Sequence, residues 1–282
     1  SGGLWVRGVP HSSHFFSLTF GEKRRGKFPK SFIPKHLRQF GPQKKSRLFE
    51  KWGGWYLTMD AAGWYTDRMK TTTIYPKSIK TPQEFSTLKK GSSNKKLGFK
   101  ITAKKWGGKR LYSLTLTERE TCPASCHHWE DCYGNNMPFA HRFSIMGLTE
   151  KLEIEIAALM MKHKNGIVIR LHVLGDFYSI AYVEFWERML IKYPKLCIFG
   201  YTGREIGTSI GNYIRFQNNM YPEQCVIRFS RSKESKDGTL YAAEESYTGK
   251  YFDCPEQSGK IDSCAACGLC WISPRTVRFK TH

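Results

Sequence analysis

The feature that most restricts the fold is a regular alternation of apolar and amphipathic runs in the second half of the chain. Strand-like apolar runs cover Leu111 to Leu116, Ile167 to Leu174, Leu196 to Tyr201 and Cys225 to Ser230. Helical patterns lie between them, over Phe139 to Lys164, Ser179 to Tyr193 and Ile206 to Met220. Alternating strands and helices build βα units, and near-continuous apolar strands are covered on both faces. The pattern therefore predicts an α/β core with a parallel sheet, as a partial or closed (β/α) barrel.

Three cysteines lie in one short loop directly after the first predicted strand. The segment TERETCPASCHHWEDCYGNNM contains Cys122, Cys126 and Cys132, here called the first cysteine group. One loop of this length can turn three thiols toward a common centre, and thiolate sulfur is a ligand for soft metals and iron–sulfur clusters. His127 or His128 could supply a fourth ligand and close the site.

A second cysteine group lies in the tail segment YFDCPEQSGKIDSCAACGLCW. Its members follow the spacing C-x9-C-x2-C-x2-C and are Cys254, Cys264, Cys267 and Cys270. The compact C-x2-C-x2-C run is typical of loops that hold a cubane cluster, whereas zinc ribbons use two separated pairs. We expect one or two [4Fe–4S] clusters, with zinc as the alternative.

The nine cysteines also indicate a cellular compartment. An odd number with two tight groups fits metal ligation in a reducing environment better than a disulfide framework. The two remaining cysteines, Cys197 and Cys225, lie in apolar strands and are expected in the core. No apolar run approaches the roughly 20 residues that span a bilayer, and no secretory pattern is present. We therefore expect a cytoplasmic protein with no membrane partner.

Positive charge is concentrated in the first part of the chain. Residues 1–120 carry 26 Lys and Arg against 7 Asp and Glu, a net 26 − 7 = +19 of the total +21. Aromatic residues such as Trp106 alternate with the basic runs, a composition that suits nucleic acid, either DNA or RNA. The alternative is that the rings are core and the lysines a solvated face. The residues expected to bind are Lys23, Arg24, Arg25, Lys44, Lys45, Arg47, Lys104, Lys105, Lys109 and Arg110.

The composition divides the chain into three parts. Residues 1–110 form a basic, aromatic-rich region, 111–232 the (β/α) core with the first cysteine group, and 233–282 a tail with the second. Strand-like pieces at Trp55 to Met59 and Leu97 to Thr102 suggest that the first part is folded, with Lys89 to Lys96 as a flexible loop.

Polar residues follow the predicted strands of the core, where parallel α/β folds place their active sites. We expect cofactor contacts from Gly175, Asp176, Phe177, Thr202 and Ser230. Asp176 and Arg204 are the candidate catalytic residues. Asp176 could instead cap the next helix, and Arg204 could be a surface residue. His172, on the same strand face as Arg170 and Leu174, is either a core histidine or a residue of the barrel mouth.

The order of strand, cysteine loop, helix and Gly-acidic turn resembles the radical S-adenosylmethionine superfamily. The resemblance implies a barrel in which Cys122, Cys126 and Cys132 hold a [4Fe–4S] cluster whose open iron chelates S-adenosylmethionine. It places Gly175 and Asp176 of VLGDFY where the family's turn meets the methionine amino group. The spacing here is C-x3-C-x5-C, whereas the superfamily usually has C-x3-C-x2-C.

Residues 95–272 are also similar to the phage gene-product-eighty-eight family, through TCPASC, CYG, HVLGDFYS and CGLCW. Together these features predict an iron–sulfur protein that acts on nucleic acid, with radical chemistry that would require an electron donor. The alternative is a non-catalytic nucleic-acid-binding protein with structural metal sites. A two-metal nuclease is not supported, because the strand ends lack convergent carboxylates.

Overall fold

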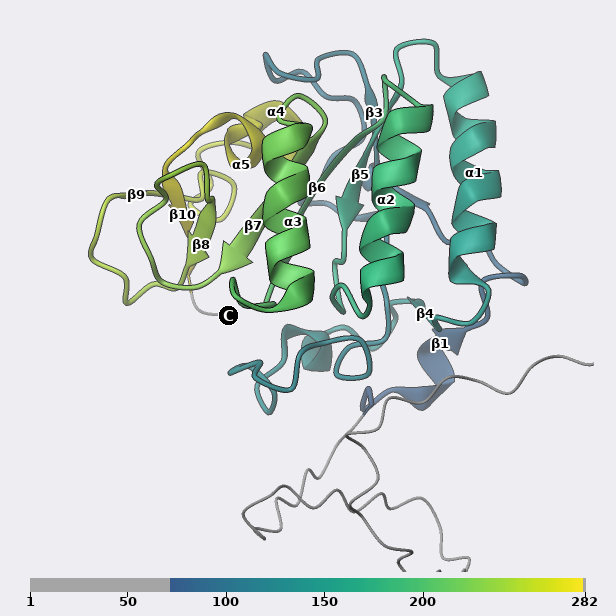
Figure 1. The fold of residues 1–282 in the computed structure, drawn as a ribbon, viewed down its shortest axis with the longest axis horizontal. Helices are drawn as coiled ribbons and strands as arrows, with labels where there is room; N and C mark the ends of the chain where they lie inside the picture. Colours follow the sequence, from purple (N-terminus) through teal and green to yellow (C-terminus); the bar gives the residue numbers. More distant parts are fainter. Residues whose placement is uncertain (1–71, 281–282) are drawn as a thin grey trace, which may run out of the picture. The chain divides into compact units, whose positions relative to one another are not determined.

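The computed structural model describes residues 72–280 (Figure 1). The chain divides into two compact units, Ser1–Tyr65 and Thr66–His282, and every described residue belongs to the second. The predicted strand at Trp55 to Met59 lies outside the described residues. None of the helices in residues 72–280 combines the length and apolar character that a bilayer-spanning segment requires.

The described residues contain a large sheet, a two-stranded sheet and five α-helices. The large sheet consists of β2 (Lys89–Lys90), β3 (Arg110–Ser113), β5 (Ile167–Leu171), β6 (Cys197–Thr202), β7 (Cys225–Ser230), β8 (Tyr241–Ala243), β9 (Tyr251–Asp253) and β10 (Thr276–Arg278). The small sheet pairs β1 (Ile79–Lys80) with β4 (Arg142–Phe143). The helices are α1 (Leu148–Lys162), α2 (Ile180–Lys192), α3 (Ser209–Met220), α4 (Cys264–Cys267) and α5 (Leu269–Ile272).

The central strands follow one another across the sheet in chain order. The order is β2-β3-β5-β6-β7-β8-β10-β9, and neighbours from β3 to β8 are parallel. Helices α1, α2 and α3 lie on one face (Figure 1). A doubly wound sheet would reverse its strand order at a switch point, and strands β3 to β8 show no such reversal. β2 and β9 are the two edges, so the described residues do not close the sheet into a barrel.

Both faces of the sheet are buried, which explains the near-continuous apolar strands. One face carries Ile167, Ile169 and Leu171 of β5 and packs against α1, α2 and α3. The opposite face carries Val168 and packs against the tail helices and residues 97–106. Alternate side chains of one strand therefore enter two separate cores.

Several predicted boundaries moved, and one predicted loop is ordered. The helix expected from Phe139 begins only at Leu148, because β4 and a left-handed Gly147 precede it. Leu97 to Thr102 forms no strand. Lys89 to Lys96, expected as a flexible loop, contains β2 and a 3-10 helix, since Lys89 and Lys90 pair with β3.

Candidate metal and catalytic site

A buried ion pair anchors the loop that carries the first cysteine group. Arg142 Nε lies 2.7 Å from Glu118 Oε2, and both side chains are almost fully buried. The Arg142 guanidinium also donates to the carbonyls of Gly134, Met137 and Ala140. One arginine therefore connects the start of the loop to the chain beyond its last cysteine.

The three thiols of the first cysteine group are half-buried neighbours that influence one another. Burial raises the pKa of Cys122 to about 12, and the charges of Asp176, Cys126 and Cys132 add to this. Burial also raises the pKa of Cys126 and of Cys132. Groups with raised pKa values are protonated at neutral pH, and a metal ion that binds them would displace the protons.

Arg119 provides a buried donor without an acceptor beside this group. Its Nε donates to the carbonyl of Trp129 at 3.1 Å, and its Nη2 donates to Asn135 Oδ1 at 2.8 Å. Its Nη1 is buried and has no hydrogen-bond partner among the described residues. The positive charge of Arg119 lowers the pKa of Cys132, against the larger effect of burial. An unused N–H donor beside a thiol fits a thiolate or sulfide acceptor.

The Gly-acidic turn after β5 packs directly on the cysteine loop. Gly175 has a φ of 81°, and a Cβ there would lie 2.5 Å from Thr121 Oγ1 and 2.7 Å from Leu116 Cβ. The backbone N–H of Asp176 donates to the same Thr121 hydroxyl at 3.1 Å. Glycine is therefore required for the approach to Thr121, which immediately precedes Cys122.

The Asp176 carboxylate links the ends of β5 and β6. It accepts hydrogen bonds from the Thr202 hydroxyl and from the backbone N–H groups of Gly203 and Phe177, each at 2.7 Å. Burial raises its pKa to about 6, and these hydrogen bonds oppose the shift. The interpretation of Asp176 as a helix cap is wrong, because Ser179 caps α2 through its contact with the Tyr182 N–H.

Arg204 is an internal tie between loops, so its interpretation as a surface residue is not supported. Its Nε donates to the carbonyl of Phe177 at 2.6 Å, and its Nη2 donates to the carbonyl of Thr121 at 2.8 Å. The Phe177 side chain is buried in the helix-side core. Ser230 is half-buried, and its carbonyl accepts from Arg231 at 2.9 Å. Gly175, Asp176, Thr202 and Arg204 thus form one network, which excludes the Ser230 side chain.

The second cysteine group lies on the opposite face of the sheet from α1, α2 and α3. Burial raises the pKa of Cys264 to about 12, and the charges of Cys270 and Cys254 add to this. Burial raises the pKa of Cys270 as well, opposed by a hydrogen bond from Tyr201 and by the charge of Arg228. The tail cysteines therefore also form a neighbouring set.

Two arginines that the sequence analysis did not single out as binding residues lie near this second group: Arg228 is buried and Arg170 is half-buried. Arg228 donates to the carbonyls of Cys270, Tyr241 and Arg275 at 2.8 to 3.1 Å. Burial lowers the pKa of Arg170, opposed by Tyr201 and by the thiols of Cys264 and Cys270. Such buried cations would stabilise thiolate ligands. The sequence signal that could have identified them is an arginine within an apolar strand, as in RLHVL and VIRFS.

Four of the residues predicted to bind nucleic acid are described, and they lie near the amino ends of the strands, away from the first cysteine group. They are Lys104, Lys105, Lys109 and Arg110. Lys109 Nζ donates to the carbonyls of Asn165 and Lys195, just before β5 and β6. Lys105 donates to the carbonyl of Pro222, before β7, and Arg110 lies over the Phe99 ring. Lys104 is exposed. The other six predicted contacts, Lys23, Arg24, Arg25, Lys44, Lys45 and Arg47, lie outside the described residues.

Trp106 and His172 are core residues. The Trp106 ring stacks on Trp271 with centroids 5.4 Å apart. His172 has a φ of 54°, so it breaks the alternation that predicted its face, and its Nε2 lies 3.0 Å from the Tyr182 hydroxyl. Burial lowers its pKa to about 3, with a smaller effect of Arg170. Its position against α2 excludes it from the barrel mouth.

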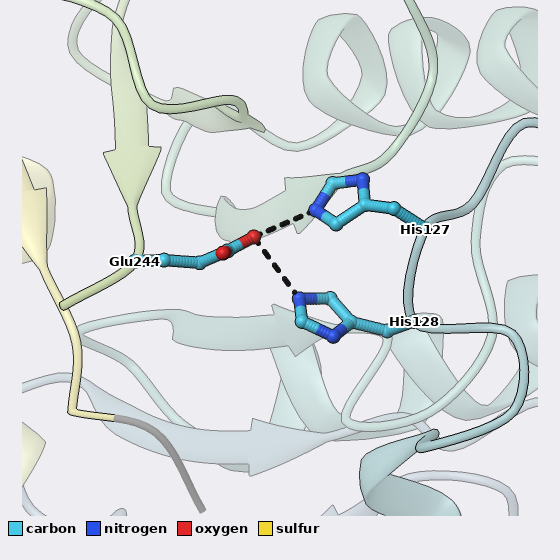
Figure 2. Close-up of side chains that lie close together, drawn as sticks. All are labelled: His127, His128 and Glu244. Atoms are coloured by element: carbon cyan, nitrogen blue, oxygen red, sulfur yellow. Dashed lines mark hydrogen bonds and ion pairs between the residues drawn. The ribbon is translucent and has the colours of Figure 1, made fainter. Parts of the chain in front are cut away.

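The two histidines of the cysteine loop contact Glu244 and are not grouped with the thiols of the first cysteine group. Figure 2 shows the rings of His127 and His128 directed at Glu244, which follows β8. Within the described residues, the compact sets of potential metal-ligand atoms include no thiol together with either imidazole.

Comparison with known proteins adds a family relationship. The family model described as Gene product 88 matches residues 86–263. A "Gene 88 protein" of Mycobacterium phage L5 is 25% identical over 142 residues, which cover 43% of this chain and 57% of that protein. The chain thus spans little more than half the length of this relative. No solved structure matches. The match includes the first cysteine group and ends before Cys264.

Proposed function

The chain belongs to the gene product 88 family, and we propose that it is an iron–sulfur protein that acts on nucleic acid with radical S-adenosylmethionine-like chemistry. The observation that carries the proposal is the first cysteine group itself. Three half-buried thiols that influence one another lie in one loop after β3, and the buried Arg119 Nη1 lacks an acceptor. Metal-bound thiolate or sulfide would accept a hydrogen bond from this donor.

The residues that would hold the clusters follow from this arrangement. Cys122, Cys126 and Cys132 would hold one cluster with an open iron position, and the second cysteine group would hold another with four thiolates. A cluster of the first kind, when bound, would supply an electron for reductive cleavage of a coordinated sulfonium compound. The closed group would hold the tail in place or pass electrons from a donor protein.

The turn after β5 would orient the bound cofactor. An ionised carboxylate has about four acceptor positions, and three of those on Asp176 are filled by protein donors. The remaining position, on Oδ2, can accept from an ammonium group. Thr202 and Gly203 hold the carboxylate still, and Arg204 fixes the loops on either side. Gly175 allows the close approach.

The nucleic-acid part of the proposal rests on charge. Residues 1–120 carry a net +19, which far exceeds what solubility requires, and the rest of the chain is nearly neutral. Because Lys105 and Lys109 donate to backbone carbonyls, the polymer contacts would come mainly from the basic runs between Lys23 and Arg47.

One observation favours a second candidate, a non-catalytic nucleic-acid-binding protein with structural clusters. Asp176 and Arg204 are both engaged in hydrogen bonds within the protein. A residue that only connects loops would show the same contacts. Cofactor cleavage separates the two candidates.

Metal analysis of anaerobically purified protein tests the cluster assignment. We expect about eight iron and about eight sulfide per chain, and loss of about half of each in Cys126→Ala and in Cys267→Ala. Cys225→Ala, a buried cysteine whose thiol contacts Asn218, is the matched control and should keep both clusters. Zinc without iron in the wild-type protein would refute the proposal.

Cofactor cleavage tests the chemistry. The reduced protein should convert S-adenosylmethionine to 5′-deoxyadenosine, and Cys126→Ala should abolish the product. Asp176→Asn should raise the concentration of S-adenosylmethionine required while the iron content stays unchanged. A full iron complement with no 5′-deoxyadenosine would select the non-catalytic candidate.

A further inference from the structure

We propose that His127, His128 and Glu244 form a separate binding site for one divalent transition-metal ion. The inference does not depend on the iron–sulfur proposal. It concerns imidazole and carboxylate atoms outside both cysteine groups, and no cysteine takes part.

The three ligand atoms converge on one point. His127 Nε2 lies 2.7 Å from Glu244 Oε1, and His128 Nε2 lies 3.2 Å from the same oxygen. All three ligand atoms lie within 4.8 Å of one another, and no other set of three or more such groups in residues 72–280 is this compact. Figure 2 shows both rings turned toward the carboxylate from the same side.

The separations match the ligand angles around one ion. With metal–nitrogen and metal–oxygen bonds of about 2.1 Å, atoms 2.7 Å and 3.2 Å apart subtend about 80° and about 100° at the metal. Both angles are close to the 90° between neighbouring ligands of an octahedron. Two histidines and one carboxylate in this geometry are the ligand set of mononuclear Fe²⁺ sites, and the same set binds catalytic Zn²⁺.

A neighbouring carboxylate orients one of the imidazoles. Asp131 Oδ2 lies 3.3 Å from His128 Nδ1, on the side of the ring opposite the ligand nitrogen. A proton held on Nδ1 leaves the Nε2 lone pair free for a metal. Carboxylate-to-histidine contacts of this kind are a regular second layer around metal sites.

The site connects two distant parts of the chain and is open to solvent. His127 and His128 belong to the loop of the first cysteine group, whereas Glu244 follows β8, and the side chains are 47%, 48% and 49% exposed. Three protein ligands leave coordination positions that water or an oxygen-containing ligand can fill. A bound ion would therefore tie the cysteine loop to the far part of the sheet and present an accessible metal beside it.

Cobalt binding to the full chain tests the inference. Protein purified anaerobically, with its cysteine sites as isolated, is dialysed against Co²⁺, and bound cobalt is measured together with its absorption spectrum. We expect one Co²⁺ per chain with ligand-field bands and no sulfur-to-cobalt charge-transfer band. Glu244→Gln and the double variant His127→Gln/His128→Gln should weaken binding at least about 100-fold, and Asp131→Asn about 10-fold or more.

Controls separate this site from the cysteine groups. Glu245→Gln changes the adjacent exposed carboxylate and should bind Co²⁺ like the wild type. Equal Co²⁺ binding by all variants, or a sulfur charge-transfer band, would overturn the inference. Loss of iron and sulfide from the double histidine variant would also overturn it, because the imidazoles would then be cluster ligands. Iron, sulfide and 5′-deoxyadenosine measurements report on the proposed function separately.

Discussion

At the scale of single residues, the turn after β5 depends on the absence of a side chain at Gly175. Its φ of 81° lies in the left-handed region, and the space where a Cβ would lie is filled by Thr121 and Leu116. Gly207, with a φ of 102°, has no atom within 4 Å of the position that a Cβ would occupy. Replacing either glycine adds backbone strain, but only at Gly175 would the new side chain also collide with neighbouring atoms.

We expect Gly175→Ala to lower the free energy of unfolding by about 2–6 kcal/mol, the sum of backbone strain and overpacking. Gly207→Ala carries only the strain and should cost about 1–3 kcal/mol. Urea denaturation of both variants measures the difference. Equal losses would show that the turn can move away from Thr121.

His172 is a buried titratable group that makes stability depend on pH. Burial lowers its pKa from 6.5 to about 3. Between these values the unfolded chain binds a proton that the folded chain does not. Stability contributed by this group is therefore complete above pH 6.5 and is lost as the pH falls toward 3.

We expect His172→Asn to remove up to about 1.4 kcal/mol per pH unit from the slope of unfolding free energy against pH in this window. Asparagine tolerates the positive φ of this position. Denaturation curves at pH 4, 5, 6 and 7 measure the slope. The exposed His141→Gln is the control: partial burial and the charges of Lys89 and Lys80 lower its pKa too, but less far, so this variant should change the slope over a smaller part of the window. A wild-type slope in His172→Asn would contradict the assignment.

At the scale of elements, the Glu118–Arg142 ion pair holds the cysteine loop between β3 and β4. Neither side chain has appreciable contact with solvent. The Thr73 hydroxyl donates to the second carboxylate oxygen at 2.6 Å, so both oxygens of Glu118 accept a hydrogen bond. Removal of one partner leaves a buried charge without compensation, which costs more than the pair itself contributes.

We expect Arg142→Met to lower the free energy of unfolding by about 3–5 kcal/mol and to reduce the iron content of the first cysteine group. The double variant Glu118→Met/Arg142→Met should lose less than the sum of the single variants, because no unpaired charge remains. Arg231→Met breaks a pair with Glu205 that is partly exposed and should cost at most about 1 kcal/mol. Additive losses in the double variant would show that the charges are not coupled.

At the scale of the whole molecule, the charge asymmetry predicts a salt-dependent interaction. The basic runs from Lys23 to Arg47 belong to the unit Ser1–Tyr65, whereas Lys104, Lys105 and Lys109 belong to the other unit. Of the latter three, Lys105 and Lys109 donate to backbone carbonyls. The two sets should therefore contribute differently to binding.

We expect the affinity for single-stranded nucleic acid to fall steeply with salt concentration. Replacing six basic residues with glutamine should reduce the slope of log K against log salt concentration by up to about 4, at about 0.7 per lost phosphate contact. These residues are Lys23, Arg24, Arg25, Lys44, Lys45 and Arg47. Glutamine at Lys104, Lys105 and Lys109 should change the slope by less than about 1. Fluorescence anisotropy with the full chain measures both slopes. An unchanged slope in the first variant would refute nucleic-acid binding by the basic runs from Lys23 to Arg47.

Hydrophobic periodicity was sufficient to predict the order of the strands and helices of the core, and cysteine spacing was sufficient to define the two cysteine groups. β7 was predicted at its observed bounds, and β5, β6, α2 and α3 within three residues at each end. The start of α1 was missed by nine residues, because the amphipathic pattern continues through β4 and the turn at Gly147. Hydrophobic periodicity is a local property and does not reveal a strand that pairs with distant Ile79.

The sequence by itself determined the βα succession and the gathering of seven cysteines into two short segments. Only the tertiary structure decided which residues meet. It placed Arg170 and Arg228 beside the second group, engaged Arg204 with carbonyls, and brought Glu244 to His127 and His128 across more than a hundred residues. Ligand type follows from local chemistry, whereas such contacts depend on how distant strands are ordered in the sheet.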